Sequence, residues 1–209
     1  MRDDEAKRIS KLEADNSVKQ ASLAEEIIRY FLEPDRPFAL RPSHIKQLQA
    51  AAVDGIVANP GQWRGGQVII IKSTHEPPGP HLVEHLVQEM CDYVNENFHE
   101  KTALHLAAYV MWRLNWIHPF SDGNGRTSRA VSYIVLCSHV KILLPGTSSI
   151  PQQIEENRAA YFRALEAADE ALRETDEIDI SVMEETLKSM LATQLLSVIN
   201  KADGGANTS

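Results

Sequence analysis

Apolar residues recur along most of the chain at intervals of three and four, which is the period of an amphipathic helix. In the first strongly periodic segment, Leu23, Ile27, Tyr30 and Phe31 share one face, and Pro34 ends the pattern. The same spacing predicts further helices along the rest of the chain. The expected helices cover residues 18–32, 43–55, 81–98, 102–116, 125–139, 151–173 and 179–200.

One short segment departs from the helical period. Residues 67–71 read QVIII, follow Gly65 and Gly66, and precede a proline-rich segment at 73–80. A β-branched run bounded by glycine and proline is typical of a strand. We therefore expect an all-α fold with one small β-hairpin.

The composition is that of a globular protein. The chain has 209 residues, 43% of them hydrophobic and 24% charged, which suits one domain of ordinary size. Both ends lack a clear apolar pattern, so we expect a charged, flexible N-terminus at 1–16, a single domain at 17–200 and a flexible tail at 201–209. The distant Cys91 and Cys137 lie in periodic apolar runs and are interpreted as buried, reduced thiols.

Membrane insertion and secretion are not indicated. No stretch reaches the roughly 18 consecutive apolar residues that span a bilayer, and the start, MRDDEAKRISKLEADN, has no apolar core of a signal peptide. We therefore expect a cytoplasmic protein that has no membrane partner.

The formal net charge of −8 argues against non-specific nucleic-acid binding, but it is unevenly distributed. Within residues 101–150 the only acidic side chain is Asp122, whereas the basic ones are Lys101, Arg113, Arg126, Arg129 and Lys141. Positive charge concentrated in one stretch of an acidic chain predicts that this stretch binds an anion.

The sequence WIHPFSDGNGRTSRA at 116–130 contains groups suited to binding phosphate. Gly123 and Gly125 permit the positive φ angles with which successive N–H groups form an anion-binding nest at the start of the next helix. Arg126 and Arg129, three residues apart, place two guanidinium groups on the same helix face.

Two further residues of this stretch offer chemistry beside a phosphate. Asp122 is a hard oxygen ligand for Mg²⁺. His118 is the group whose ordinary pKa suits proton abstraction near neutral pH. The stretch therefore combines a base, a metal ligand and a phosphate cradle.

The motif also carries a family resemblance. HPFSDGNGRTSR matches every specified position of the signature HPFx[D/E]GNGRxxR and so resembles the Fic (filamentation induced by cAMP) family. The similarity covers roughly residues 41–196: GQWRGGQVIIIKSTHEPPGP resembles the family's flap hairpin, and ENRAAYFRALEAAD the helix after the active site. The resemblance implies a Fic-type helical bundle and a nucleotidyltransferase that moves AMP from ATP onto a hydroxyl side chain of a target protein.

The resemblance also implies a role for each matched residue. His118 would deprotonate the Tyr, Thr or Ser hydroxyl of the target, and Asp122 would hold Mg²⁺ at the phosphates of ATP. The phosphates themselves would be bound by Gly123, Asn124, Gly125, Arg126 and Arg129. The target segment would dock by strand addition on the flap residues Val68, Ile69, Ile70 and Ile71.

Many Fic proteins are restrained by a helix with the pattern [S/T]xxxE[G/N], whose glutamate pairs with the second arginine of the motif. Ser22 to Glu26 has this spacing but is followed by Ile27, and Ser181 to Glu185 is followed by Thr186. Glu26 is the candidate inhibitory residue and Glu185 a weaker one. Two other partners are compatible with the sequence: a separate antitoxin protein that restrains the activity, and a second copy of the chain in a homo-oligomer.

Other interpretations compete with this one. A Fic-type transferase could use another nucleotide or phosphate donor, or the fold could serve as a nucleotide-binding module, although a binder would not need His118. From a different class, His81 to His85 matches the H-x-x-E-H pattern of inverted zinc peptidases, with Glu155 or Glu156 as a third ligand. Such a short pattern often arises by chance as two surface histidines on an amphipathic helix.

Overall fold

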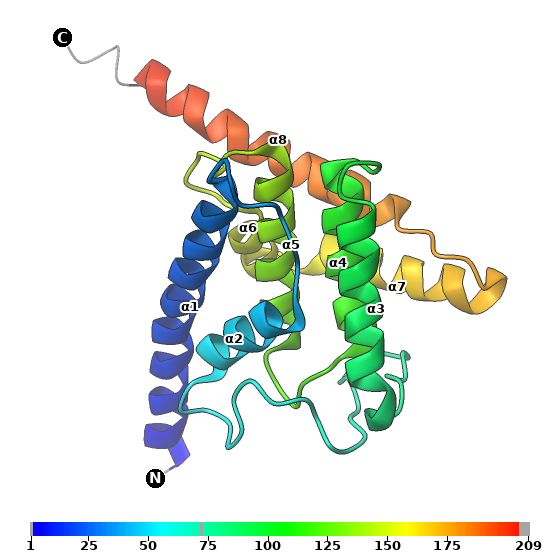
Figure 1. Cartoon of the computed structure of the whole chain (residues 1–209). Coiled ribbons are helices and arrows are strands. Elements are labelled where there is room, and N and C mark those ends of the chain that lie inside the picture. Colours follow the sequence, from blue (N-terminus) through cyan, green and yellow to red (C-terminus); the bar gives the residue numbers. More distant parts are fainter. Residues whose placement is uncertain (1, 72, 205–209) are drawn as a thin grey trace.

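The computed structural model describes residues 2–71 and 73–204 as a bundle of helices (Figure 1). The helices α4 and α5 pack side by side in its centre, α1 packs on α5 and α2, and α8 crosses one end of the bundle against α4, α6 and α7. The all-α fold class is confirmed. The elements are α1 (Arg2–Leu32), α2 (Pro42–Val53), the 3-10 turn η1 (Pro80–Leu82), α3 (Val83–Glu96), α4 (Ala103–Ile117), α5 (Asn124–Val140), α6 (Ile150–Glu156), α7 (Ala159–Thr175) and α8 (Ser181–Gly204).

The two central helices hold most of the core. In α4 the run from Leu106 to Trp112 is buried, and α5 is buried on all sides because α1, α2, α4 and α6 surround it. A helix enclosed in this way needs apolar or small residues around its whole circumference. Cys91 and Cys137 are free, buried thiols, and burial raises the pKa of Cys91 to about 12. The turn that joins α4 to α5 is thus held at both ends by the most buried helices.

The first helix is longer than its apolar period predicts. It begins at Arg2 and not near residue 18. Its inner face uses buried amides: Asn16 Nδ2 donates to the carbonyl of Asp54 at 2.8 Å, and Gln20 Nε2 donates to the carbonyl of Leu48 at 3.0 Å. These contacts fasten α1 to α2 through polar groups, which a hydrophobic period cannot detect. Residues 2–16, expected to be flexible, are therefore helical.

At the other end of the chain, residues 201–204 belong to α8, whereas 205–209 lie outside the described residues. The division into one domain with two flexible ends stays a prediction. Within 2–71 and 73–204, none of the helices has the length and apolar character needed to cross a bilayer.

The predicted hairpin is not formed, and the described part of the chain contains no strand. Residues 67–70 have no regular secondary structure, and the returning chain carries Pro77 and Pro78, which have no N–H to donate to a ladder. The side chain of Gln67 takes the place of a backbone pair, with its Nε2 donating to the carbonyl of Pro77 at 2.8 Å. The two arms therefore lie together without a β-ladder.

The single helix expected at 151–173 is divided into α6 and α7. Asn157 is extended, with φ −143° and ψ 97°, and its Oδ1 accepts a hydrogen bond from the backbone N–H of Ala159 at 3.2 Å. A contact between an Asn side chain and a nearby backbone N–H competes with the backbone hydrogen bonds of a helix. Here it ends α6, and α7 begins after it. The break places Arg158 at the first turn of α7, beside the candidate site.

Candidate active site

The backbone at the end of α4 determines how His118 is presented. Its N–H donates to the carbonyl of Leu114 at 3.0 Å, and its φ of 50° and ψ of 57° are left-handed. A left-handed residue at a helix C-terminus ends the helix and turns the chain away, and Pro119 prevents continuation. The ring nitrogen Nδ1 lies 3.3 Å from the carbonyl of Asn115, which can only accept, so Nδ1 carries the proton of the neutral ring. Nε2 is then the basic nitrogen.

The surroundings of His118 favour that neutral form. Burial lowers the pKa of His118 below its ordinary value of 6.5; the hydrogen bond to Asn115 opposes this shift, whereas the positive charge of Arg64 reinforces it. Burial acts in this direction because an imidazolium loses its hydration when it leaves water. His118 is therefore unprotonated at neutral pH, as a general base must be.

The turn after His118 is closed by Asn124. Its Oδ1 accepts from the N–H of Phe120 at 2.9 Å, and its Nδ2 donates to the carbonyl of Phe120 at 2.9 Å. The ring of Phe120 is fully buried and lies 4.9 Å from the ring of Trp63, centroid to centroid. Asn124 uses its amide to hold the shape of the turn and also lines the pocket, and its contact with a phosphate stays a prediction.

Gly123 allows the turn to enter α5. Its φ is 81°, and a Cβ at this position would lie 2.8 Å from Cγ1 of Val53, so only glycine fits here. The N–H groups of the first helical turn have no acceptor within α5, and they lie at the positive end of the helix dipole. Gly123 and Gly125 line the pocket beside this helix start, and its binding of an anion stays a prediction. Gly125 does not take the positive φ angle expected of it, because it already lies within α5.

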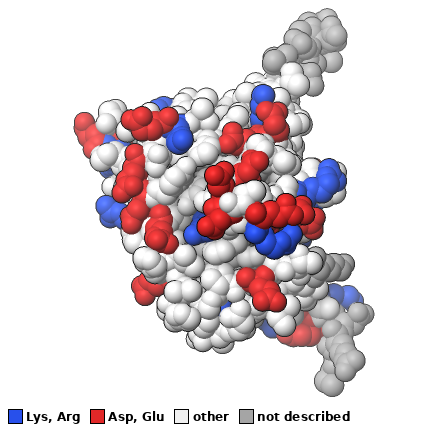
Figure 2. Space-filling view, turned by 90° about the vertical axis from the view of Figure 1, so that its right-hand side faces the viewer, with Lys and Arg blue, Asp and Glu red and all other residues white. Residues whose placement is uncertain are grey.

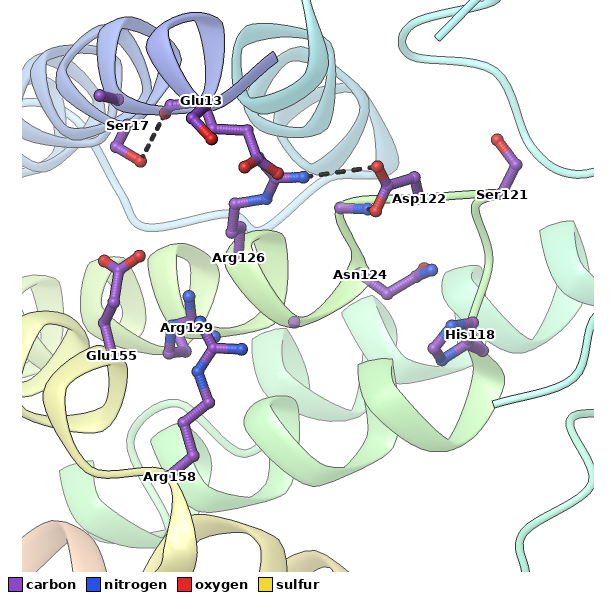
Figure 3. Close-up of a pocket in the computed structure, with 14 residues that line it drawn as sticks. Glu13, Ser17, His118, Ser121, Asp122, Asn124, Arg126, Arg129, Glu155 and Arg158 are labelled. Carbon is purple, nitrogen blue, oxygen red and sulfur yellow. Dashed lines mark hydrogen bonds and ion pairs between the residues drawn. The ribbon is translucent and has the colours of Figure 1, made fainter. Parts of the chain in front are cut away.

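Three guanidinium groups lie around this helix start (Figure 3). Arg126 is held by the carbonyl of Ala52 at 3.0 Å and lies 3.5 Å from Oδ2 of Asp122. Arg129 is only 7% exposed, and within the described ranges it has no hydrogen bond or ion pair. Arg158 reaches the same pocket from the start of α7. The sequence pattern did not single out Arg158, because only the break at Asn157 turns it toward the site.

These groups line a pocket of about 580 Å³, which a second cavity extends. The second cavity has about 360 Å³ and is also lined by His118, Gly125, Arg129 and Arg158. Beyond them its walls are largely apolar and come from Tyr161, Phe162, Leu165, Ile70 and Ile71. The site is thus elongated, with a cationic end at α5 and an apolar end between α7 and residues 70–71.

The pocket with the three arginines differs from the outer surface in its charged side chains. In Figure 2, which shows the right-hand side of Figure 1, acidic side chains outnumber basic ones. A groove of about 930 Å³ next to the apolar cavity is lined by Glu76, Glu166, Asp169, Glu170 and Asp176, together with Arg113 and Arg173. The pocket gathers three arginines, Arg126, Arg129 and Arg158, but the carboxylates of Glu13, Asp122 and Glu155 line it as well.

The structure brings a different glutamate to the pocket than the one predicted. Glu26 is exposed on α1 and does not line the pocket, whereas Glu13 does, with its Oε1 3.7 Å from Nη1 of Arg126. Thirteen residues of helix separate the two, a rise of about 20 Å. Glu185 lies on α8, away from the pocket. The pattern search missed Glu13 because Ile9 stands four residues before it, where the pattern requires Ser or Thr.

The predicted flap residues lie at the mouth of the apolar cavity. Ile70 and Ile71 line it, and Ile69 and Ile71 expose 90% and 86% of their surface. Val68 is half-buried. Lys72, next in the chain, lies outside the described residues.

The zinc-peptidase pattern does not assemble a site. His81 lies in η1, His85 lies in α3 with its Nε2 3.4 Å from Oε1 of Glu89, and both histidines are exposed. Glu155 lines the cationic pocket instead. Across residues 2–71 and 73–204, no group of three His, Cys, Asp or Glu side chains could hold a metal ion. The two histidines are surface residues.

Comparisons with known proteins point to one family. Residues 39–136 match the model of the Fic/DOC family. The chain is 32% identical over 115 residues to a protein of Drosophila willistoni named protein adenylyltransferase Fic, and 31% identical over 115 residues to the protein of that name in Drosophila virilis. These alignments span 53% of this chain and about a fifth of the relatives' length (20% and 21%).

Solved structures share the fold. A Fic-domain-containing signaling protein from Bacteroides thetaiotaomicron aligns with a TM-score of 0.71 at 21% identity, over 90% of this chain and 72% of its own. Fic-1 (residues 134–508) from C. elegans aligns with a TM-score of 0.64 at 20% identity, over 92% of this chain and 52% of its own. At these identities the likeness establishes the fold alone.

Proposed function

We propose that this chain belongs to the Fic/DOC family, whose model matches residues 39–136, and that it is a protein adenylyltransferase. It would transfer AMP from ATP, with Mg²⁺, to the hydroxyl group of a Tyr, Thr or Ser side chain in a target protein. The relatives named protein adenylyltransferase support this proposal.

The observation that carries the proposal is the state of Arg129. A guanidinium that is 7% exposed and has no hydrogen bond or ion pair in the described part of the chain is costly, because a buried charge normally requires a partner. Arg129 lines both cavities, next to Arg126 and Arg158 in the cationic one. Burial lowers the pKa of Arg129, although the negative charge of Glu155 favours its charged form. An anion with several negative charges, such as a polyphosphate, would therefore be a favourable partner.

The site also suits Mg²⁺. Asp122 lines the pocket, its side chain is 48% exposed, and its Oδ1 accepts from the N–H of Gly123 at 2.6 Å. Protein sites for Mg²⁺ often supply one or two carboxylates and leave the remaining positions to phosphates and water. When bound there, Mg²⁺ would neutralise charge on the phosphates during transfer.

The residues divide the reaction between them. Nε2 of His118 takes the proton of the acceptor hydroxyl, and that oxygen forms a bond to the α-phosphorus. The bond between this phosphorus and the bridging oxygen breaks, and pyrophosphate leaves with the electron pair. Arg126, Arg129 and the start of α5 hold the phosphates in line for the attack. In phosphoryl transfer, positioning and charge stabilisation account for most of the catalysis.

The second cavity suits the nucleoside. It continues directly from the phosphate end, and its apolar wall includes Tyr161 and Leu165. Asp169 lines its far part, with Oδ1 accepting from Nε1 of Trp112 at 2.8 Å. A carboxylate in this place can accept a hydrogen bond from an exocyclic amino group, which adenine has and uracil lacks. This arrangement favours ATP over UTP.

The flap residues would dock the target. Residues 67–70 have no ladder partner in the described part of the chain, and of their carbonyls that of Ile70 accepts from the N–H of Ser73 at 3.2 Å. The other backbone groups would be open to an added strand, and Ile69 and Ile71 are exposed. Main-chain pairing would place the target beside the cavity that leads to His118.

The proposal is tested by incubating the purified chain with Mg²⁺ and ATP, GTP, CTP or UTP in turn. Intact-mass and peptide mass spectrometry then follow addition of the nucleoside monophosphate to the chain itself and to proteins of a lysate. The His118→Ala variant is the matched control. Transfer from ATP that requires His118 supports the proposal. Transfer from UTP alone would assign another donor, and ATP binding without transfer would make the chain a nucleotide-binding module.

A further inference from the structure

A buried arginine outside the Fic motif joins the catalytic turn to the flap. Arg64 is 6% exposed and lies in the connection between α2 and η1. Its Nε donates to the carbonyl of His118 at 2.7 Å, and its Nη2 donates to the carbonyl of Ile117 at 3.4 Å. Its backbone N–H donates to the carbonyl of Pro119 at 2.9 Å. One residue thus contacts three successive carbonyls of the turn that presents the base.

The same guanidinium also holds both sides of the flap. Nη1 donates to the carbonyl of Gly66 at 3.0 Å, just before the flap residues, and Nη2 donates to the carbonyl of Pro78, where the chain returns toward α3. Within 2–71 and 73–204 no carboxylate lies within ion-pair distance of Arg64. All its side-chain acceptors are backbone carbonyls.

This arrangement has an electrostatic reason. Burial lowers the pKa of Arg64, which shows that the charge is held at a cost. The carbonyls of Ile117 and His118 lie at the negative end of the α4 dipole and lack helical partners, so a cation is favourable there. The planar guanidinium spreads its five N–H donors in fixed directions, and a lysine ammonium cannot reach carbonyls that lie on several sides.

We propose that Arg64 is a positioning residue that couples the flap to His118. The acceptor hydroxyl of a target docked on the flap would then lie at Nε2 of His118. This inference rests on the proposed transferase function. Arg64 would act by fixing the position of the left-handed backbone of His118 relative to the two ends of the flap. A displacement of about 1 Å between reacting groups can cost roughly 100-fold in rate.

Gln67 provides a matched control. Its Nε2 donates to the carbonyl of Pro77 at 2.8 Å, so it ties the two arms of the flap together without contacting the turn at His118. The substitution Gln67→Met should loosen the flap alone, whereas Arg64→Lys, which keeps the charge, should loosen the flap and the turn.

The experiment compares the wild-type chain with Arg64→Lys, Arg64→Met and Gln67→Met. Hydrogen exchange is followed by mass spectrometry in peptides that contain residues 73–75, residues 116–120 and the centre of α5. Residues 73–75 report on the flap because the N–H of Ser73 donates to the carbonyl of Ile70 at 3.2 Å. ATP affinity is measured by calorimetry and the self-modification rate at saturating ATP and Mg²⁺. For both Arg64 variants we expect faster exchange at 73–75, at least tenfold faster exchange at 116–120, unchanged exchange in α5, ATP affinity within threefold of wild type, and a transfer rate reduced about 100-fold.

For Gln67→Met we expect faster exchange at 73–75 only and a smaller loss of transfer rate. Wild-type exchange at 116–120 or a wild-type rate in Arg64→Lys would overturn the inference. So would faster exchange throughout α5 in both Arg64 variants, because that would make Arg64 a general stabiliser. A wild-type chain that transfers no nucleotide would contradict the proposed function, whereas the exchange pattern would still show whether Arg64 joins the flap to the turn.

Discussion

Oε1 of Glu13 lies 3.7 Å from Nη1 of Arg126, which places a carboxylate of α1 in the pocket that His118 also lines. The side chain of Glu13 is half exposed, and that of Arg126 is 17% exposed. A polyphosphate bound at the start of α5 would have to compete with this carboxylate for Arg126 and would be repelled by its charge. Glu13 is therefore placed to restrain nucleotide binding.

Removing this carboxylate should raise activity. We expect Glu13→Ala to increase the self-modification rate at subsaturating ATP by about twofold to fivefold, because a half-exposed ion pair contributes only up to about 1 kcal/mol. Glu26→Ala, on the outer face of the same helix, is the control and should leave the rate unchanged. Equal rates for wild type and Glu13→Ala would contradict a restraining role, and a gain in Glu26→Ala would assign that role to Glu26.

Removing the base should abolish transfer without abolishing binding. We expect His118→Ala to lower the transfer rate by about 10² to 10⁴-fold, the usual contribution of a general base. The ATP affinity, measured by calorimetry, should stay within a few-fold of wild type because the phosphate contacts come from α5 and α7. A variant with the full rate would disprove the proposed mechanism.

Replacing Arg129 should have opposite effects on stability and on binding. Without a ligand its guanidinium makes no hydrogen bond or ion pair in the described part of the chain, and burial lowers its pKa. Arg129→Met should therefore raise the melting temperature of the free protein by about 2–4 °C for each kcal/mol regained. The ATP affinity should fall about tenfold to a hundredfold, because a charged hydrogen bond contributes about 1.5–3 kcal/mol. Thermal unfolding with and without ATP measures both effects. A lower melting temperature of the free variant, or unchanged affinity, would show that Arg129 is satisfied in another way.

The acid limb of the pH–rate profile should lie below the ordinary pKa of histidine. Burial disfavours the imidazolium form of His118 and lowers its pKa below 6.5, so the base stays unprotonated at pH 7 and becomes protonated only at lower pH. The transfer rate at saturating ATP and Mg²⁺ should therefore be flat near pH 7 and fall below the lowered pKa. Rates measured from pH 5 to 8, with ATP affinity determined at each pH, provide the check. A midpoint at or above 6.5 would mean that His118 is not the titrating base.

Much of the fold could be predicted from the sequence because its helices bury apolar faces with a regular period. Where polar contacts replace that period, prediction failed. The inner face of α1 uses Asn16 and Gln20, so its first half looked like a charged, flexible end. The run at 67–71 has strand propensity, but a strand needs a partner that can donate hydrogen bonds, and the prolines of the returning chain cannot.

The chemistry at the turn between α4 and α5 was determined by the sequence itself, because His118, Asp122, Gly123 and Arg126 lie within nine consecutive residues and need only one local backbone path to meet. The tertiary structure alone decided which distant residues join them. Arg64, Arg158 and Glu13 arrive from three separate segments, and only the crossing of α1 over α5 selects Glu13 over Glu26. Local spacing records which residues share a face of one helix, whereas packing between helices determines what that face contacts.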